Sequence, residues 1–167
     1  NLPKIQRMFL ENNMITGELP SSIGHLATLT DIFFSNNQFT GQIPKSFGNL
    51  KSLQFLDLSR NKLVGPLPPQ LANLRLQSLD LSYNPLELAS VPSWFLKLNL
   101  FRLTLAKTGI KGRLPLWLSS SSISYLDLSS NELQGKLPSW LGNMTNLSFL
   151  NISNNYFCST LPESFKN

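Results

Sequence analysis

The sequence contains one cysteine, Cys158, and one histidine, His25, among its 167 residues. A single cysteine cannot form a disulfide within the chain, and it leaves the redox compartment open. His25 lies in "SIGHL", where matching positions of later segments carry Asn49 and Asn143, so an outer turn is expected there. With one histidine and no cysteine pair, the sequence indicates neither a Ser-His-Asp site nor a metal centre, and no enzyme is expected.

Charge and long apolar runs are also scarce. Only 14% of the residues are charged, the formal net charge is +5, and the lysines and arginines form no run of the kind that binds nucleic acid. No apolar stretch approaches the roughly 20 residues that span a bilayer. Because Asn1 does not begin a signal peptide, the chain is mature, truncated or intracellular. We expect no nucleic acid partner and no membrane contact by this segment.

What the chain does contain is one segment in seven copies. The segment "LDLSRNKLVGPLP" (56–68) returns with substitutions in six further copies, which begin at Met8, Ile32, Leu79, Leu103, Leu126 and Leu150. Successive copies start 23 or 24 residues apart. Such a period predicts a repeat solenoid, with a single domain of about seven repeats over residues 1–167. The glycines follow the repeat and form no phosphate-binding loop, so no cofactor is expected.

Each column of the repeat has a physical role. The leucines of "LDLS" alternate with other residues, so they face one side of a strand, and consecutive strands must stack in parallel to bury them. The asparagine that follows can donate to and accept from backbone groups that the turn leaves unpaired. We expect a ladder of buried asparagines at Asn13, Asn37, Asn61, Asn84, Asn131 and Asn155. Thr108 stands in this column and is expected to break the ladder.

The second half of the repeat reads N-x-L-x-G-x-[IL]-P, as in "NQFTGQIPKSFGNL" (37–50) and "NELQGKLPSWLGNM" (131–144). This resembles the plant extracellular type of leucine-rich repeat protein over the whole chain. The resemblance implies a right-handed leucine-rich-repeat superhelix, with a parallel β-sheet on the concave face and short second β-strands and 3₁₀ turns on the convex side. Family members usually have cysteine pairs in caps at both ends. None is present here, so we expect a fragment of a longer protein that lacks both caps.

The fourth and fifth repeats depart from this pattern. "NPLELASVP" (84–92) has Leu88 and Ala89 where other repeats have glycine, and it contains one extra residue. The connections that lead into repeats four, five and six are each one residue short. These departures predict an irregular convex side between residues 84 and 122. The irregularity is either a docking patch or drift that a repeat tolerates.

Three N-x-S/T triplets lie close together in "NMTNLSFLNISNN" (143–155), at Asn143, Asn146 and Asn151. The repeat consensus itself generates some triplets of this kind. All three asparagines are nevertheless expected to be accessible, which favours a secretory pathway and glycosylation at Asn143 or Asn146. Asn151 is the weaker candidate, because it occupies the strand position of Asp57, where the sheet is crowded.

Binding in such a scaffold is expected on the solvent-facing strand positions of the concave face. Exposed aromatic and arginine side chains are typical interface anchors, and Phe9, Phe33 and Phe55 are expected to form a neighbouring cluster. A basic group could attract an acidic partner. The candidate residues are Arg7, Phe9, Phe33, Phe55, Arg60, Tyr83, Arg102, Lys107 and Tyr125. The alternatives are aromatic rings that only pack on each other and charges that are only solvated.

The resemblance implies a non-catalytic protein-recognition module of the plant extracellular space, which binds a protein or peptide through its concave face. It would be a receptor or co-receptor ectodomain, or a soluble relative of the polygalacturonase-inhibiting type, to which "LAKTGIKGRLPLWL" (105–118) is similar. The alternative is a surface that binds cell-wall polysaccharide, such as pectin, or ice. Ice binding favours flat arrays of Thr, Asn and Ser, which phenylalanines and charges interrupt here.

Overall fold

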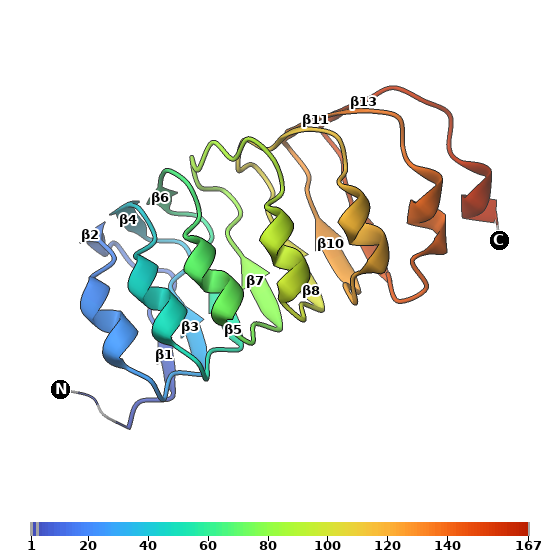
Figure 1. Cartoon of the computed structure of the whole chain (residues 1–167). Helices are drawn as coiled ribbons and strands as arrows, with labels where there is room; N and C mark the ends of the chain where they lie inside the picture. The colour runs from blue at the N-terminus through green and yellow to red at the C-terminus, as the bar shows by residue number, and fades with distance from the viewer. Residues whose placement is uncertain (1, 3, 167) are drawn as a thin grey trace.

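The computed structural model describes residues 2 and 4–166. Seven short parallel strands, one from each repeat, form a single sheet in the order in which they occur in the chain (Figure 1). The strands are β1 (Arg7–Phe9), β3 (Asp31–Phe33), β5 (Phe55–Asp57), β7 (Ser78–Asp80), β8 (Arg102–Thr104), β10 (Tyr125–Asp127) and β12 (Phe149–Asn151). This arrangement confirms the repeat solenoid and its parallel sheet.

The central residue of each strand faces the core. Leu56 pairs in register with Leu79, and Leu103 pairs with Leu126. These four leucines are at most 1% exposed, whereas the strand residues on either side of them are half-buried, apart from Thr104, which is buried as well. The alternation follows from the two-residue period of a strand. Neighbouring repeats thereby contribute to one continuous hydrophobic core.

Short 3₁₀ turns lie across the core from the sheet (Figure 1). They are η1 (Ser21–His25), η2 (Lys45–Asn49), η3 (Pro69–Asn73), η4 (Ser93–Lys97), η5 (Leu116–Ser120), η6 (Ser139–Asn143) and η7 (Glu163–Lys166). The first six follow a proline in extended conformation, which has no N–H to donate and suits the start of a turn. A Cβ atom at Gly48 would lie 2.6 Å from Gln70, so glycine is what lets η2 approach η3 closely.

The connections from a 3₁₀ turn to the next strand differ in length by one residue. The backbone just after the turn accommodates this difference. In the longer connection after η2, Leu50 has φ −77° and ψ 68°, and the Lys51 N–H donates to the Asn49 carbonyl at 2.9 Å. This is an inverse γ-turn. After η3 the corresponding Leu74 is extended, with ψ 167°. The short connections therefore run straight into the next strand.

The second strands form two separate sheets. One contains β2 (Thr16–Glu18), β4 (Gln38–Gly41) and β6 (Lys62–Leu63), and the other contains β9 (Lys111–Gly112), β11 (Glu132–Gly135) and β13 (Tyr156–Phe157). Within the described residues, the fourth repeat contributes no second strand. The break confirms the irregular convex side that the sequence predicts between residues 84 and 122.

The asparagine ladder joins consecutive repeats. Asn61, which is 7% exposed, accepts from the Phe39 N–H through Oδ1 at 3.0 Å. Its Nδ2 donates to the carbonyls of Phe34, Leu58 and Ser59 at 3.0–3.1 Å. Thr108 breaks the ladder as predicted, because its short side chain donates only to its own repeat, at the Leu105 carbonyl.

Two rungs differ from the expectation of burial. Asn155 is half-buried, although it keeps its bonds to the Leu133 N–H and the Leu128 carbonyl of the preceding repeat. The side chain of Asn13 is exposed rather than buried, and it donates only to the carbonyls of Leu10 and Glu11 in its own repeat. The reason is that, in the described part of the chain, no strand precedes β1 for Asn13 to bridge.

The ladder generates a stability prediction. Asn61→Ala removes four hydrogen bonds at once and leaves buried backbone groups without partners, so we expect a loss of about 2–4 kcal/mol in the free energy of unfolding. Asn13→Ala is the matched control, because its bonds are exposed and local, and we expect it to change that free energy by under about 1 kcal/mol. Urea unfolding followed by circular dichroism measures both. Equal effects would contradict the ladder as a source of stability.

Candidate functional site

The concave face of the sheet presents three solvent-facing positions per repeat. The first column consists of Arg7, Asp31, Phe55, Ser78, Arg102, Tyr125 and Phe149. The second column consists of Phe9, Phe33, Asp57, Asp80, Thr104, Asp127 and Asn151. The third column lies just beyond the strands and consists of Asn12, Asn36, Arg60, Tyr83, Lys107, Ser130 and Asn154. All nine predicted binding residues lie on these columns. Six of them lie in the strands, and Arg60, Tyr83 and Lys107 lie in the third column.

The third column has a backbone feature that sequence reasoning missed. All seven residues adopt a left-handed conformation, with φ between 53° and 60°. Asparagine tolerates this conformation, and its recurrence at Asn12, Asn36 and Asn154 was the available signal. Arg60 and Tyr83 are not favoured there, so backbone preference does not explain their presence. The Arg60 guanidinium lies 4.4 Å from the centre of the Tyr83 ring, a cation–π contact.

The expected cluster of Phe9, Phe33 and Phe55 is instead two separate aromatic pairs. Phe9 and Phe33 lie in one column on adjacent strands, with ring centres 5.3 Å apart. Phe55 lies in the other column and contacts Phe101, whose ring centre is 6.5 Å away. Sequence reasoning missed Phe101 because it precedes β8 and belongs to none of the strand columns. The correction follows from the strand period, which places Phe33 and Phe55 in different columns.

Three adjacent strands hold a stack of side chains in the first column. The Arg102 guanidinium lies 4.0 Å from the centre of the Tyr125 ring. Tyr125 stacks on Phe149, with ring centres 4.0 Å apart and ring planes within 5° of parallel. Arg102, Tyr125 and Phe149 pair in register, so the backbone sets their separation. We call these three residues the Arg–Tyr–Phe stack.

Charges of both signs are spread along the concave face. Asp57, Asp80 and Asp127 each accept a hydrogen bond at 2.9 Å from the backbone N–H two residues later. The second carboxylate oxygen of Asp127 accepts from Asn151. Arg7 forms an ion pair with Asp31 at 3.5 Å. Lys107 is exposed in the third column. The face can therefore meet a ligand that carries both positive and negative groups.

Asp80 is the carboxyl group whose pKa is clearly shifted by its environment. Burial raises the pKa of Asp80, and the neighbouring Asp57 charge raises it further. The Ser82 backbone N–H opposes the shift, because it stabilises the charged form, and the hydroxyls of Ser82 and Thr104 oppose it to a smaller extent. At neutral pH the charged form of Asp80 therefore lowers the stability of the folded state.

The three candidate glycosylation sites differ in their surroundings. Asn143 at the end of η6 and Asn146 are exposed, as predicted. Asn151 is half-buried, and its Nδ2 donates to Asp127 Oδ2 at 3.1 Å. The Asn151 side chain also accepts from the Ser153 N–H, in the way that the aspartates of this column do. Asn151 is therefore less accessible than the other two, because its amide nitrogen already bonds a strand neighbour, and its glycosylation stays the weakest of the three predictions.

His25 and the acidic residues bear on other classes of site. His25 is exposed at the end of η1, in the predicted outer turn. Among residues 2 and 4–166, no three His, Cys, Asp or Glu side chains gather closely enough to hold a metal ion. The same residues include no helix with the length and apolar character needed to cross a bilayer.

A stacked parallel sheet with an open, chemically varied concave face defines a repeat solenoid that presents a binding surface. Leucine rich repeat family models match residues 3–63 and residues 75–98, 122–144 and 146–167. The chain belongs to the leucine-rich repeat family. The comparison with curated proteins found no match.

Solved structures of plant leucine-rich repeat proteins are similar to this chain. The Arabidopsis receptor kinase HAESA, solved with the peptide hormone IDA and the co-receptor SERK1, has a TM-score of 0.90 at 34% identity. The ectodomain of the Arabidopsis thaliana receptor kinase GASSHO1/SCHENGEN3, in complex with CASPARIAN STRIP INTEGRITY FACTOR 2, has a TM-score of 0.86 at 30% identity. Both matches cover 96% of this chain, which spans 28% and 20% of those two chains.

A plant ice-binding protein has a TM-score of 0.71 at 24% identity, over 96% of this chain and 68% of that one. Likeness at this identity shows the shared fold alone.

The buried carboxyl group generates a pH prediction. Asp80→Asn keeps an acceptor for the Ser82 N–H, as Asn151 does for Ser153, and removes the buried charge. Because folding raises the pKa of Asp80, its contribution to stability is unfavourable above that raised value and recovers as the pH falls through it. We expect the variant to melt a few degrees higher than the wild type at neutral pH, with the difference vanishing in acid. A melting temperature that is lower at neutral pH would contradict this reading of Asp80.

Proposed function

We propose that the chain is a non-catalytic recognition segment of a plant extracellular leucine-rich repeat protein, and that it binds a protein or peptide on the concave face. The observation that carries this proposal is the Arg–Tyr–Phe stack. It places an arginine and two aromatic rings, the residue types that dominate interface energies, on three adjacent strands.

The stack is preorganised. Tyr125 is held between Arg102 and Phe149, so little side-chain freedom remains to be lost when a ligand binds. Phe149 is still 38% exposed and offers apolar surface. A guanidinium that stacks by its face keeps its edge free to donate to a carboxylate. These properties suit a ligand with an acceptor group beside an aromatic or aliphatic group.

The strand spacing suits an extended peptide that crosses the strands. Strands lie about 4.8 Å apart and an extended chain advances about 3.3 Å per residue, so about three peptide residues reach across the stack. A peptide that continues toward β7 and β5 meets Asp80 and Asp57, which favour basic residues. Because acidic residues lie at one end of this path and Arg102 at the other, the charges would fix the direction in which the peptide lies.

The comparisons support a peptide ligand in an extracellular setting. The similar structures of HAESA and GASSHO1/SCHENGEN3 are plant receptor kinase ectodomains in complex with peptide hormones or factors. A signalling or defence receptor, a co-receptor and a soluble inhibitor of the polygalacturonase-inhibiting type all fit the proposal. That the chain is part of a longer protein without its caps stays a prediction.

Pectin and ice are less well supported as ligands. A pectic polyanion would meet Arg60, Arg102 and Lys107, but Asp57 and Asp80 in the adjacent column would repel it. Phe9 and Phe149 project from the concave face and break the flat polar array that ice binding favours.

Glycosylation at Asn143 or Asn146 belongs to the same proposal, because both side chains are exposed. We expect glycopeptide mass spectrometry of protein made in plant cells to find a glycan on at least one of them and none on Asn151. Asp127→Ala serves as the matched variant, since it frees the Asn151 amide nitrogen from its partner. Unmodified asparagine at both exposed sites would sink the expectation of a glycoprotein.

The binding prediction uses the peptide fraction of a plant extracellular extract and the full-length glycosylated protein. We expect Arg102→Ala with Tyr125→Ala to weaken the tightest peptide by about thirtyfold, as for other interface anchors. Leu116→Ala is the control, because this side chain is 70% exposed on η5, away from the concave face. Phe9→Ala with Phe33→Ala tests the other end of the face. If both concave variants retain every peptide at wild-type affinity, the concave site is wrong.

A further inference from the structure

The turn η6 carries a candidate glycosylation site three residues after a tryptophan. Asn143 begins an N-x-T triplet, and Trp140 precedes it on the same turn. The turn has 3₁₀ geometry, in which the Leu141 N–H donates to the Pro138 carbonyl at 3.1 Å. Side chains three residues apart are eclipsed in a 3₁₀-helix. The side chains of Trp140 and Asn143 therefore lie one above the other.

The other two faces of η6 are occupied by the protein itself. Leu141 is 3% exposed and faces the core. A Cβ atom at Gly142 would collide with the carbonyl of Ser164 in η7, so this face packs closely on the seventh repeat. The face that holds Trp140 and Asn143 thus points away from both the core and the seventh repeat.

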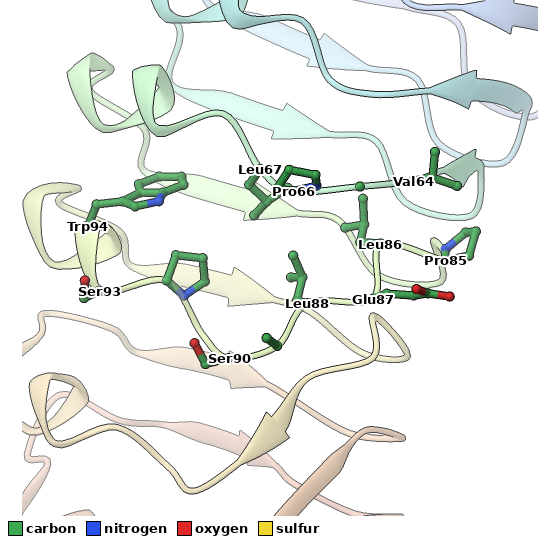
Figure 2. Close-up of a pocket in the computed structure, with 13 residues that line it drawn as sticks. Val64, Pro66, Leu67, Pro85, Leu86, Glu87, Leu88, Ser90, Ser93 and Trp94 are labelled. Atoms are coloured by element: carbon green, nitrogen blue, oxygen red, sulfur yellow. The ribbon is translucent and has the colours of Figure 1, made fainter.

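Trp94 indicates where side chains in the position of Trp140 reach. It holds the same place in η4, at one end of a groove of about 770 Å³ that the third and fourth repeats line together (Figure 2). Its ring points toward Pro66 and Leu67 of the third repeat, which is the repeat before its own (Figure 2). By the same geometry Trp140 extends toward the fifth repeat, where η5 ends in two small, exposed serines.

Trp140 differs from the other two tryptophans of this column in its contacts. Trp94 and Trp117 both pack edge-on against Phe95, with ring centres 4.5 Å and 6.5 Å away. Within residues 2 and 4–166, Trp140 stacks on no other aromatic ring. Its indole is half-buried against the core. The part of the ring that the core leaves uncovered is therefore available on the face that Asn143 shares.

Only the sixth repeat combines the two residues. The tryptophans of η4 and η5 are followed three residues later by Lys97 and Ser120. The asparagines that end η2 and η3, Asn49 and Asn73, have serine and glutamine three residues before them, and neither begins an N-x-S/T triplet. The repeat consensus therefore does not account for a tryptophan beside a glycosylation triplet.

The backbone holds Asn143 at a fixed point. Its carbonyl accepts from the Thr145 N–H at 3.0 Å, across Met144 with φ −79° and ψ 81°, which is an inverse γ-turn. A sugar that is attached to an ordered residue loses less conformational freedom when it settles on a neighbouring ring. Asn146 lies beyond this turn, in the segment that leads to β12.

The first sugar of an N-linked glycan suits an indole ring. It is N-acetylglucosamine, whose axial C–H groups form an apolar face on the pyranose ring. The face of an aromatic ring is the negative side of its quadrupole, so it attracts these weakly positive C–H groups. Contact between the two faces also removes apolar surface from water.

We propose that Trp140 is the platform for a glycan on Asn143, with the C–H face of the first N-acetylglucosamine on the indole. This inference rests on the glycosylation proposed above and selects Asn143 from its two exposed candidates. The contact stabilises the sixth repeat. It also holds the glycan on the side of the core opposite the sheet, so the Arg–Tyr–Phe stack on the concave face stays accessible.

The test is a double-mutant cycle on protein secreted from plant cells, with Asn143→Gln and Trp140→Leu alone and together. Leucine keeps an apolar contact with the core and has no ring face. We expect the Asn143 glycan to raise the melting temperature by about 2–4 °C, and by less than about 1 °C in Trp140→Leu. Trp94→Leu is the matched control, because it removes a half-buried tryptophan of the same column in a turn without a triplet. It should keep the full increment.

Trimming each glycan to its first N-acetylglucosamine with an endoglycosidase separates stacking from the bulk of the outer sugars. The single sugar should keep the increment in melting temperature. Its acetyl methyl and ring protons should move upfield in the NMR spectrum, because the indole ring current acts on them, and this shift should be absent in Trp140→Leu. Trp140→Phe, which restores a ring face, should recover part of both effects.

The inference is overturned if glycopeptide mass spectrometry finds Asn143 unmodified, or if the glycan adds the same increment in Trp140→Leu as in the wild type. Loss of the increment on trimming would also overturn it, because the outer sugars would then be its source. A glycan on Asn146 alone would overturn it and leave the glycoprotein proposal standing, whereas unmodified asparagine at both sites would remove both. Peptide binding on the concave face is measured separately and depends on neither outcome.

Discussion

The hydrogen-bonded rung between consecutive repeats is the constraint on which the rest of the structure depends. Each buried asparagine has one oxygen and one nitrogen to satisfy, and it bonds backbone groups of its own repeat and of the one before. This fixes the distance between repeats at the point where the chain turns away from the sheet. The strands that precede the asparagines are thereby held in register, and the leucines between them fill one core. A surface whose side chains stack across strands, such as Arg102 on Tyr125, requires that register.

The same constraint explains why a local change is tolerated in the fourth repeat. Pro85 removes a donor and Thr108 removes an acceptor, so the two losses match and few buried groups are orphaned. Leu86 and Leu88 find other acceptors within the fourth and fifth repeats. The first sheet passes through this region without a break, because its rungs involve different backbone groups. A solenoid can thus open its convex side and keep its concave side intact.

Most of the fold could be predicted from the sequence, because a period repeated seven times leaves little freedom. The strand positions, the inward leucines, the ladder, its interruption at Thr108 and the irregular region all follow from columns of residue types. Side-chain contacts between columns could not be predicted in the same way. Phe55 meets Phe101 rather than Phe33, since that choice depends on side-chain directions and on a residue outside the strands. The exposure of Asn13 also escaped prediction, because a column identifies a residue's role but not whether a preceding repeat is present to bridge.

Pro85 shows what a consensus comparison leaves out. The missing glycine and the extra residue of the fourth repeat attract notice first, yet neither explains the loss of the strand. The missing backbone donor explains this loss, because Pro85 stands at the repeat position where Gln38 and Glu132 each supply an N–H. On the concave face the backbone is already paired along the sheet, so the ligand proposed there would be bound by side chains.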